Sequence, residues 1–407
     1  MIHNSFLILY FNRLFYHYLW KKTVKIGVPV EQFTGENRVA LVPDVVKKLV
    51  KDGFSVLIEK GAGDRAFYSD SDYVAAGAKI APTAEELYSS SNIIFKVRQP
   101  LTQAEGKDEV SLLKKDTLLV SFLQPMQNTA LMQELAARGI NAISMDFIPR
   151  TTKAQRMDAL SSQNNLAGYK AALTAANHYG RIFPMLMTAA ATITAAKVLV
   201  IGAGVAGLQA LGTARRLGAV VEVTDVRTAV KEEVHSLGGK FIDILPGANL
   251  QDERGYAREA TPEELQMQKE ALLRHVKGND IIISTAVVPG RKAPEIITEE
   301  MVKEMKNGSV IVDLAADFGG NCTLTKPSQT ITAHGVTIIG ESNFPSQMAP
   351  QASDLYAKNI YALIEYMKGK QETLTVNTED EIVKESLITW QGSVFNSRVL
   401  SLISKNG

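Results

Sequence analysis

The segment Lys197–Arg227 constrains the fold of this chain more than any other stretch. It starts with a β-branched apolar run over Val198–Ile201, which is typical of a buried parallel strand. A glycine-rich turn and a helix-forming stretch that ends at Gly218 come next, and a second apolar run, Ala219–Val223, leads to Asp225. This order predicts a strand–helix–strand unit with both strands parallel in one sheet.

The glycines of the turn have the spacing G-x-G-x-x-G. Gly202 permits the tight turn, Gly204 lets a pyrophosphate approach the backbone, and Gly207 allows close packing of helix and strand. The helix that begins near Val205 directs its N-terminal N–H groups toward the phosphates. We therefore predict a dinucleotide site, and the alternative is an ordinary strand–helix–strand unit with a glycine-rich turn.

Asp225 comes directly after the second strand, where a carboxylate can accept hydrogen bonds from the adenosine ribose hydroxyls. The same carboxylate would repel a 2′-phosphate, so the sequence favours NAD(H) over NADP(H). Arg227 leaves an alternative open, because an arginine there could bind a 2′-phosphate, meet the pyrophosphate or lie on the surface.

Composition excludes several classes of protein. The 407 residues are enough for two or three domains, and 45% hydrophobic with 21% charged residues is ordinary for an α/β protein. A formal net charge of +1 does not imply a nucleic acid or another polyanion as partner. The single cysteine, Cys322, excludes a disulfide framework and fits a reducing cytosol. The six histidines show no metal-ligand spacing, so we expect no metal.

Strand-like and helix-like runs alternate along most of the chain, which predicts an α/β fold with mostly parallel sheets. We expect two Rossmann-like domains joined by long helices around a cleft. The first comprises 24–160 and 350–407, and the NAD(H)-binding domain comprises 161–349. The expected strands are 25–30, 55–59, 92–97, 117–122, 140–144, 198–201, 219–223, 240–244, 281–285, 309–313 and 336–339, and the main expected helices are 44–52, 128–138, 158–179 and 352–367.

Four stretches stand apart from this pattern. Residues 1–23 differ in composition from the rest of the chain; an amphipathic segment on a membrane surface and a partner-binding tail are alternatives, and we favour a disordered or non-native extension. The apolar stretch 182–196 is expected to be a buried helix that leads into the central strand, rather than a membrane span. The polar stretch 246–264 is a candidate lid or a surface loop, and 371–407 contains strand-like runs.

Several separated motifs together resemble the NAD(H)-binding alpha subunit (domain I) of proton-translocating NAD(P) transhydrogenase, a relative of alanine dehydrogenase. The resemblance runs from Lys25 to the C-terminus and excludes 1–22. The motifs that carry it are GENRVALVP (35–43), IPRTTKAQRMDALSSQNNLAGYKA (148–171), IGAGVAGLQAL (201–211), TDVR (224–227), TAVVPG (285–290) and DLAADFGGN (313–321).

The resemblance implies roles for individual residues. Arg150, Gln155, Asp158 and Ser161 match the loop that holds the nicotinamide end, with Asp158 orienting Arg150. From the residues alone, a helix N-cap with polar side chains facing solvent is the alternative for this loop. The remaining implied cofactor contacts are Thr151, Thr152, Val205, Asp225, Val226, Arg227, Gln268 and Ala286, with Val287 as an apolar contact near the nicotinamide and with Gly255 and Tyr256 in a mobile loop.

The implied activity is that of a Si/Re-type NAD(P)+ transhydrogenase, in which hydride passes directly between NADH and NADP+ held on a partner subunit. Such a reaction needs alignment of two nicotinamides and exclusion of water rather than a general base. The implied partners are a second copy in a homodimer, a membrane-spanning subunit that translocates protons, and an NADP(H)-binding beta subunit. The implied location is the cytoplasmic face of the bacterial inner membrane.

Alanine dehydrogenase is the rival within the same resemblance. Arg38 and Lys96 match its substrate-binding positions, and Asp317 matches its active-site acid. Gln124 stands where that enzyme has its acid–base histidine, and glutamine cannot transfer a proton near neutral pH. A regulatory module that senses NAD(H) is a further alternative, but no DNA-reading helix with a basic patch is apparent.

Overall fold

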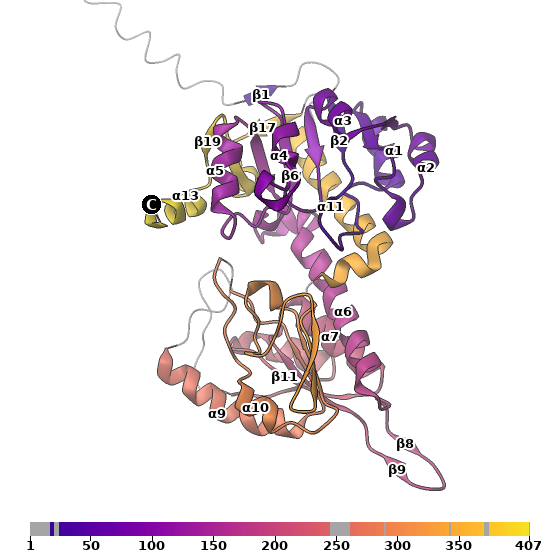
Figure 1. Cartoon of the computed structure of the whole chain (residues 1–407), viewed down its shortest axis with the longest axis vertical. Helices are drawn as coiled ribbons and strands as arrows, with labels where there is room; N and C mark the ends of the chain where they lie inside the picture. Colours follow the sequence, from indigo (N-terminus) through magenta and orange to yellow (C-terminus); the bar gives the residue numbers. More distant parts are fainter. Residues whose placement is uncertain are drawn as a thin grey trace, which may run out of the picture. The chain divides into compact units, whose positions relative to one another are not determined.

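The computed structural model describes residues 17–19, 24–244, 261–288, 290–341, 343–369 and 374–406. The chain forms two compact units (Figure 1). Unit 1 contains the described residues up to Ser162 and those from Ala349 onward, and unit 2 is Gln163–Met348.

Unit 2 is built on a seven-stranded sheet in the order β12-β11-β10-β13-β14-β16-β15. All neighbouring strands are parallel except β15 and β16. The strands are β10 (Lys197–Ile201), β11 (Val220–Thr224), β12 (Lys240–Phe241), β13 (Ile281–Ser284), β14 (Val310–Asp313), β15 (Thr330–Ala333) and β16 (Val336–Ile339), and the helices are α6 (Ala159–Tyr179, which begins in unit 1), α7 (Val205–Arg216), α8 (Lys231–Ser236), α9 (Pro262–Gly278) and α10 (Glu299–Lys303).

Both faces of this sheet are covered, which explains the continuous apolar runs of its strands. On one face, Val198 and Val200 pack with residues of α6 and α7. On the other face, Leu199 and Ile201 pack with residues of α9 and α10. The turn after β10 therefore lies at the carboxyl edge of a buried parallel sheet.

Unit 1 is built on an eight-stranded sheet in the order β19-β18-β7-β6-β5-β2-β3-β4, in which β18 and β19 are the antiparallel additions. The strands of unit 1, of which β17 lies outside this sheet, are β2 (Lys25–Val28), β3 (Ser55–Glu59), β4 (Lys79–Ala81), β5 (Ile93–Phe95), β6 (Leu118–Ser121), β7 (Asn141–Ser144), β17 (Thr375–Asn377), β18 (Leu387–Trp390) and β19 (Ser393–Val394). Its helices are α1 (Pro43–Lys51), α2 (Asp70–Ala75), α3 (Ala84–Ser90), α4 (Glu109–Leu112), α5 (Thr129–Ala137), α11 (Ala349–Lys368), α12 (Glu381–Ser386) and α13 (Ser397–Asn406). The α/β fold class predicted from the sequence is confirmed.

The expectation of a buried helix over 182–196 is wrong. The stretch contains the two-stranded hairpin β8 (Leu186–Met187) and β9 (Thr192–Ile193), which Figure 1 shows. The side chains of Leu186, Met187 and Ile193 are exposed. Thr188 closes the hairpin because its hydroxyl accepts from the N–H groups of Ala190 and Ala191. Apolar composition alone did not show that these residues lack a covering element.

Two further segments differ from the sequence-based picture. Residues 17–19 of the N-terminal extension form strand β1 (His17–Leu19), antiparallel to β17, and the rest of the extension lies outside the described residues. The final segment contains three strands (375–377, 387–390 and 393–394), as its strand-like runs predicted, and it adds helix α13, which was not predicted. The candidate lid at 246–264 also lies outside the described residues, apart from 261 and the first turn of α9.

Candidate functional site

The glycine-rich turn of unit 2 has the geometry that its spacing predicts. Gly202 has a φ of 96°, and Gly204 is the N-cap of α7. A Cβ on Gly204 would meet open space, whereas a Cβ on Gly207 would lie 1.8 Å from the carbonyl oxygen of Gly202. Gly207 is thus required for packing, while Gly204 leaves room at the N-terminus of a 12-residue helix, where N–H groups attract anions.

Asp225 is tied to this turn through its carboxylate. Oδ2 accepts from the backbone N–H of Ala203 at 2.7 Å. The guanidinium of Arg227 donates to both carboxylate oxygens at 2.9 Å, and these hydrogen bonds, together with the charge of Asp225, raise the pKa of Arg227 despite burial. In this structure the predicted ribose acceptor is therefore already paired with the arginine whose role the sequence left open.

The other predicted contacts of unit 2 lie near the carboxyl edge of the same sheet or outside the described residues. Val205 begins α7, Val226 comes after β11 and is half-buried, and Ala286 and Val287 come after β13. Val287 is an apolar side chain with 43% exposure. Gly255 and Tyr256 are outside the described residues, and of Gln268 only the backbone, within α9, is described.

In unit 1, the predicted nicotinamide loop contains the 3-10 helix η5 (Thr152–Met157). Ala154 and Met157 are buried in the core of the unit, and Gln155 between them is exposed. The side chain of Asn359 in α11 donates to the carbonyl oxygen of Arg156 at 2.9 Å, which ties the 3-10 helix to α11. The backbone is therefore anchored, and it presents the Gln155 amide outward.

Asp158 and Ser161 are a helix cap in this structure. One carboxylate oxygen of Asp158 accepts from the Ser161 backbone N–H at 2.9 Å, and the other accepts from its hydroxyl at 2.6 Å. These contacts stabilise the start of α6. At the other end of the loop, Arg150 and Thr152 are exposed and Thr151 is half-buried.

Arg38, a substrate position in the alanine dehydrogenase interpretation, is paired internally. Its guanidinium donates to Glu36 from Nε at 2.7 Å and from Nη2 at 2.6 Å, and both side chains are buried. Burial opposes ionisation of Glu36, but the charge and hydrogen bonds of Arg38 outweigh it and lower the pKa of Glu36 to about 2. The two groups form a buried, charge-assisted fork.

Lys96, the second substrate position of that interpretation, is also paired. Its Nζ lies 2.6 Å from Glu109 and 3.5 Å from Glu31, and none of the three side chains is more than slightly exposed. Burial lowers the pKa of Lys96, but the two carboxylates outweigh it and raise the pKa above its ordinary value. Lys96 is thus held as a cation between two carboxylates.

Gln124 and Asp317, the other two positions of the rival, lie in different units of the structure. Gln124 adopts a φ of 47°, and its backbone N–H donates to the buried Asp146 at 2.9 Å. Burial raises the pKa of Asp146, although its hydrogen bonds oppose this shift. Asp317 lies in unit 2 on an exposed turn.

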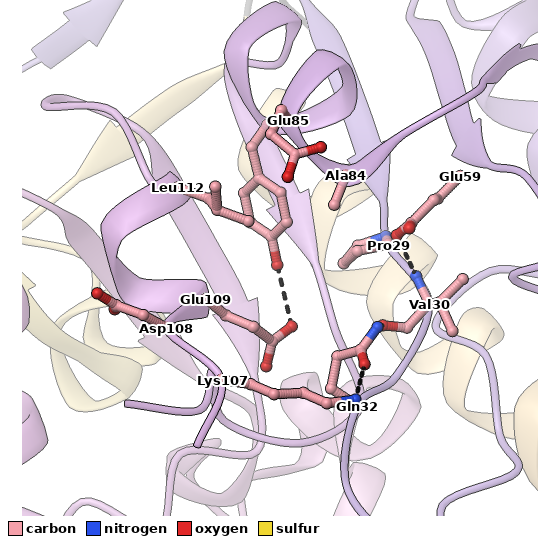
Figure 2. Close-up of a pocket in the computed structure, with 11 residues that line it drawn as sticks. Pro29, Val30, Gln32, Glu59, Ala84, Glu85, Lys107, Asp108, Glu109 and Leu112 are labelled. Carbon is pink, nitrogen blue, oxygen red and sulfur yellow. Dashed lines mark hydrogen bonds between the residues drawn. The ribbon is translucent and has the colours of Figure 1, made fainter. Parts of the chain in front are cut away.

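Unit 1 also contains a cavity of about 270 Å³, shown in Figure 2. Figure 2 shows Glu59, Glu85, Asp108 and Glu109 on its walls, with Lys107 as the cation at its edge. No residue predicted as a site from the sequence lines it. Its acidic walls would repel phosphate and carboxylate, so this cavity does not fit a nucleotide or an amino-acid carboxylate.

Sequence reasoning missed two side chains at the edge of the unit 2 sheet. Asp313 and Asn321 are both fully buried, and they hydrogen-bond to each other and to neighbouring loops. Both residues belong to a motif that carries the family resemblance, but the sequence alone suggested no role for either. The available signal was an asparagine directly after a glycine pair, shortly after a buried strand.

The described residues contain neither a metal cluster nor a membrane span. No group of three or more histidine, cysteine, aspartate and glutamate side chains there could hold a metal ion. Among the same residues, no helix combines the length and the apolar character needed to cross a membrane.

Comparisons with known proteins cover nearly the whole folded region of the chain. The chain is 48% identical to an NAD(P) transhydrogenase alpha subunit of Rhodospirillum rubrum, over 91% of this chain and 97% of that protein. It is 30% identical to alanine dehydrogenase 2 of Staphylococcus aureus, over 92% and 95%. The crystal structure of transhydrogenase from Sinorhizobium meliloti matches with a TM-score of 0.79 and 39% identity, over 92% and 99%.

The domain families agree with these relatives. The family "Alanine dehydrogenase/PNT, N-terminal domain" matches residues 27–167, and "Alanine dehydrogenase/PNT, C-terminal domain" matches residues 171–397. The resemblance to transhydrogenase alpha subunits predicted from the motifs is confirmed. Two family matches in tandem and relatives that align along nearly their full length show that the chain belongs to the alanine dehydrogenase/PNT family.

Proposed function

We propose that this chain is the NAD(H)-binding subunit of a proton-translocating transhydrogenase. Hydride passes directly between NADH on this chain and NADP+ on a partner beta subunit, and a membrane-spanning subunit couples the reaction to proton translocation. The 48% identity to a transhydrogenase alpha subunit supports this choice over alanine dehydrogenase, at 30%.

The observation that favours a transhydrogenase over an alanine dehydrogenase is the ion pairing of Arg38 and Lys96. An alanine dehydrogenase needs cations available to the substrate carboxylate and to the carbonyl of the 2-oxo acid, yet Arg38 is forked onto Glu36 and Lys96 lies between Glu31 and Glu109. Releasing either cation would leave buried carboxylates unpaired, at a cost of several kcal/mol. These contacts therefore support a structural role for both cations.

The residues of unit 2 suit the adenosine half of NAD(H). The N-terminus of α7 and the open space at Gly204 can accept the pyrophosphate. Asp225 can accept the ribose hydroxyls if Arg227 moves from one of its oxygens, and the arginine is then available to the pyrophosphate. Val205 and Val226 supply apolar contacts, with Gly255, Tyr256 and Gln268 as further contacts by resemblance.

The nicotinamide end needs alignment rather than proton transfer. When bound, the dihydronicotinamide supplies the hydride, and the chain needs only to orient the ring and keep water away. We assign the orienting contacts to Arg150, Gln155 and Ser161, with Thr151 and Thr152 beside them. Asp158 acts through Ser161, whose hydroxyl and N–H it holds.

The partners and location come from the same proposal. The chain works as a homodimer on the cytoplasmic face of the bacterial inner membrane, bound to the membrane-spanning and beta subunits. Light scattering of the purified chain tests the dimer, and a monomer at all concentrations would contradict it.

The deciding experiment mixes the chain with the NADP(H)-binding beta subunit and measures hydride transfer from NADH to thio-NADP+ by absorbance. A parallel reaction contains the chain, L-alanine and NAD+. We expect transfer in the first reaction and no NADH formation in the second. Oxidation of alanine without hydride transfer would favour the rival.

A further inference from the structure

The backbone directly after β13 is held from both sides although the strand has ended. On one side, the N–H of Thr285 donates to the carbonyl oxygen of Ile201 at 2.8 Å. The Thr285 hydroxyl also donates to the carbonyl oxygen of Gly202 at 3.1 Å. This side ties the segment to the glycine-rich turn.

On the other side, the side chain of Asn321 replaces a neighbouring strand. Its Oδ1 accepts from the N–H of Ala286 at 3.0 Å, and its Nδ2 donates to the carbonyl oxygen of Ala286 at 2.8 Å. Nδ2 also donates to the carbonyl oxygen of Pro294 at 2.9 Å. The amide thus uses its oxygen and one donor hydrogen on Ala286, next to Val287, and its other donor hydrogen on Pro294.

Asn321 is itself fixed by the buried carboxylate of Asp313. The Asn321 N–H donates to Asp313 Oδ2 at 2.7 Å, and the Asn321 carbonyl oxygen accepts from the N–H groups of Ile296 and Ile297. Asp313 also accepts from Thr325 Oγ1 at 2.7 Å. In a buried network each member restricts the others, so the position of the Asn321 amide is determined by several bonds.

These contacts place an exposed apolar side chain on a fixed backbone. Val287 comes directly after the clamped Ala286 and is 43% exposed. A rigid apolar side chain can set the height and tilt of a flat ring without bonding to it. Asn321 therefore influences the position of Val287, although the Asn321 side chain itself is fully buried.

We propose that Asn321 is a positioning residue for hydride transfer, which fixes the 285–288 backbone so that Val287 sets the position of the nicotinamide ring. This inference rests on the proposed function. Asp313 supports Asn321 by accepting a hydrogen bond from its backbone N–H. Loss of the hydrogen bonds between Asn321 and this segment changes the alignment of the ring. It leaves the contacts of the adenosine half with Gly204 and Asp225 unchanged.

The test is Asn321→Asp in the full chain, assayed with the beta subunit. The aspartate keeps the size and the acceptor but turns an oxygen toward the carbonyl oxygens of Ala286 and Pro294, so the segment must shift. We expect the rate of hydride transfer from NADH to thio-NADP+ to fall on the order of 10- to 100-fold. The dissociation constant for NADH should stay unchanged.

Two variants accompany it. Asn307→Asp makes the same chemical change at an exposed position of unit 2 and should leave the rate unchanged. Val287→Ala removes the contact without disturbing the buried network, so it should slow transfer at an unaltered melting temperature. It also provides a test if Asn321→Asp fails to fold.

The outcomes separate this inference from the function on which it rests. Wild-type chain that transfers no hydride would overturn both. Active wild type with normal rates in Asn321→Asp and Val287→Ala would overturn the inference alone. A parallel loss of NADH binding, rate and melting temperature in Asn321→Asp, with normal transfer by Val287→Ala, would show a purely structural role for Asn321.

Discussion

Replacing Glu36 with glutamine is the sharpest test of whether Arg38 is structural. The variant keeps the shape of the side chain but leaves the buried guanidinium of Arg38 against a neutral amide. The pKa of Glu36 falls from an ordinary value of 4.5 to about 2, a shift of about 2.5 units. At about 1.4 kcal/mol per unit, the carboxylate contributes about 3–4 kcal/mol to the stability of unit 1.

The pH dependence has a definite sign. Because the folded-state pKa of Glu36 lies below its unfolded value, the contribution is fully present above about pH 4.5. It is lost as the pH falls through about 2. The difference in unfolding free energy between wild type and Glu36→Gln should therefore be largest at neutral pH and shrink in acid.

Urea unfolding monitored by tryptophan fluorescence measures this difference. Trp390 is buried in unit 1, the other tryptophan, Trp20, lies outside the described residues, and residues 163–348 contain no tryptophan, so unit 2 contributes no tryptophan signal. With an m-value of about 3 kcal/mol/M, the midpoint should fall by about 1 M. Glu134→Gln, which breaks an exposed pair with Arg138, is the matched control and should cost less than about 1 kcal/mol.

A small effect would refute the reasoning. If Glu36→Gln unfolds at the midpoint of Glu134→Gln, Arg38 does not depend on Glu36 and is available to a substrate carboxylate. Glu36→Gln combined with Arg38→Met should recover some of the lost stability, because the buried charge is then gone. Failure of that recovery would show that the cost lies in packing rather than in the ion pair.

Three further predictions concern the nucleotide and its alignment. Gly207→Ala forces a Cβ against the carbonyl oxygen of Gly202, so it should lower the free energy of unfolding by about 1–3 kcal/mol and weaken NADH binding in a fluorescence titration. Gly212→Ala, whose Cβ has ordinary contacts, should have neither effect. Asp225→Asn should reduce the preference for NADH over NADPH; unchanged affinities for both would remove Asp225 from the ribose site. Gln155→Asn should slow hydride transfer much more than it weakens NADH binding, and normal transfer in the reconstituted complex would exclude an aligning role.

The strand–helix–strand unit around the glycine-rich turn was predictable because its signals are local. A β-branched run, three glycines at fixed spacing and a second apolar run predicted β10, α7 and β11 to within a few residues. Each signal reflects the backbone itself: positive φ at Gly202 and close packing at Gly207 allow no other residue without strain. The long helices α6 and α11 were also predicted from local signals in the sequence.

The hairpin at 186–193 was not predictable because exposure is a property of the whole fold. Leu186, Met187 and Ile193 form an apolar run that a buried helix would also show, yet their side chains are 45%, 74% and 44% exposed. The local signal against a helix was Thr188, which hydrogen-bonds to the turn at Ala190 and Ala191.

Side-chain partners were also beyond the sequence. The spacing placed Asp225 at the end of β11, but not its fork with Arg227 two residues later. The resemblance implied that Asp158 orients Arg150, which stays a prediction, and the hydrogen bonds from Ser161 to both carboxylate oxygens of Asp158 are contacts that the spacing did not specify.

Two aspartates along one sheet edge show why such residues need a structure to be assigned. Asp225 comes after β11, and its oxygens accept from Arg227, a side chain that can move away. Asp313 ends β14, is fully buried, and accepts from Ser284, Thr325 and three backbone N–H groups. A ligand hydroxyl can compete for the first carboxylate but has no access to the second. Position at the end of a strand therefore predicts the sheet edge, while the burial and the hydrogen-bond partners of each carboxylate determine which one a ligand could reach.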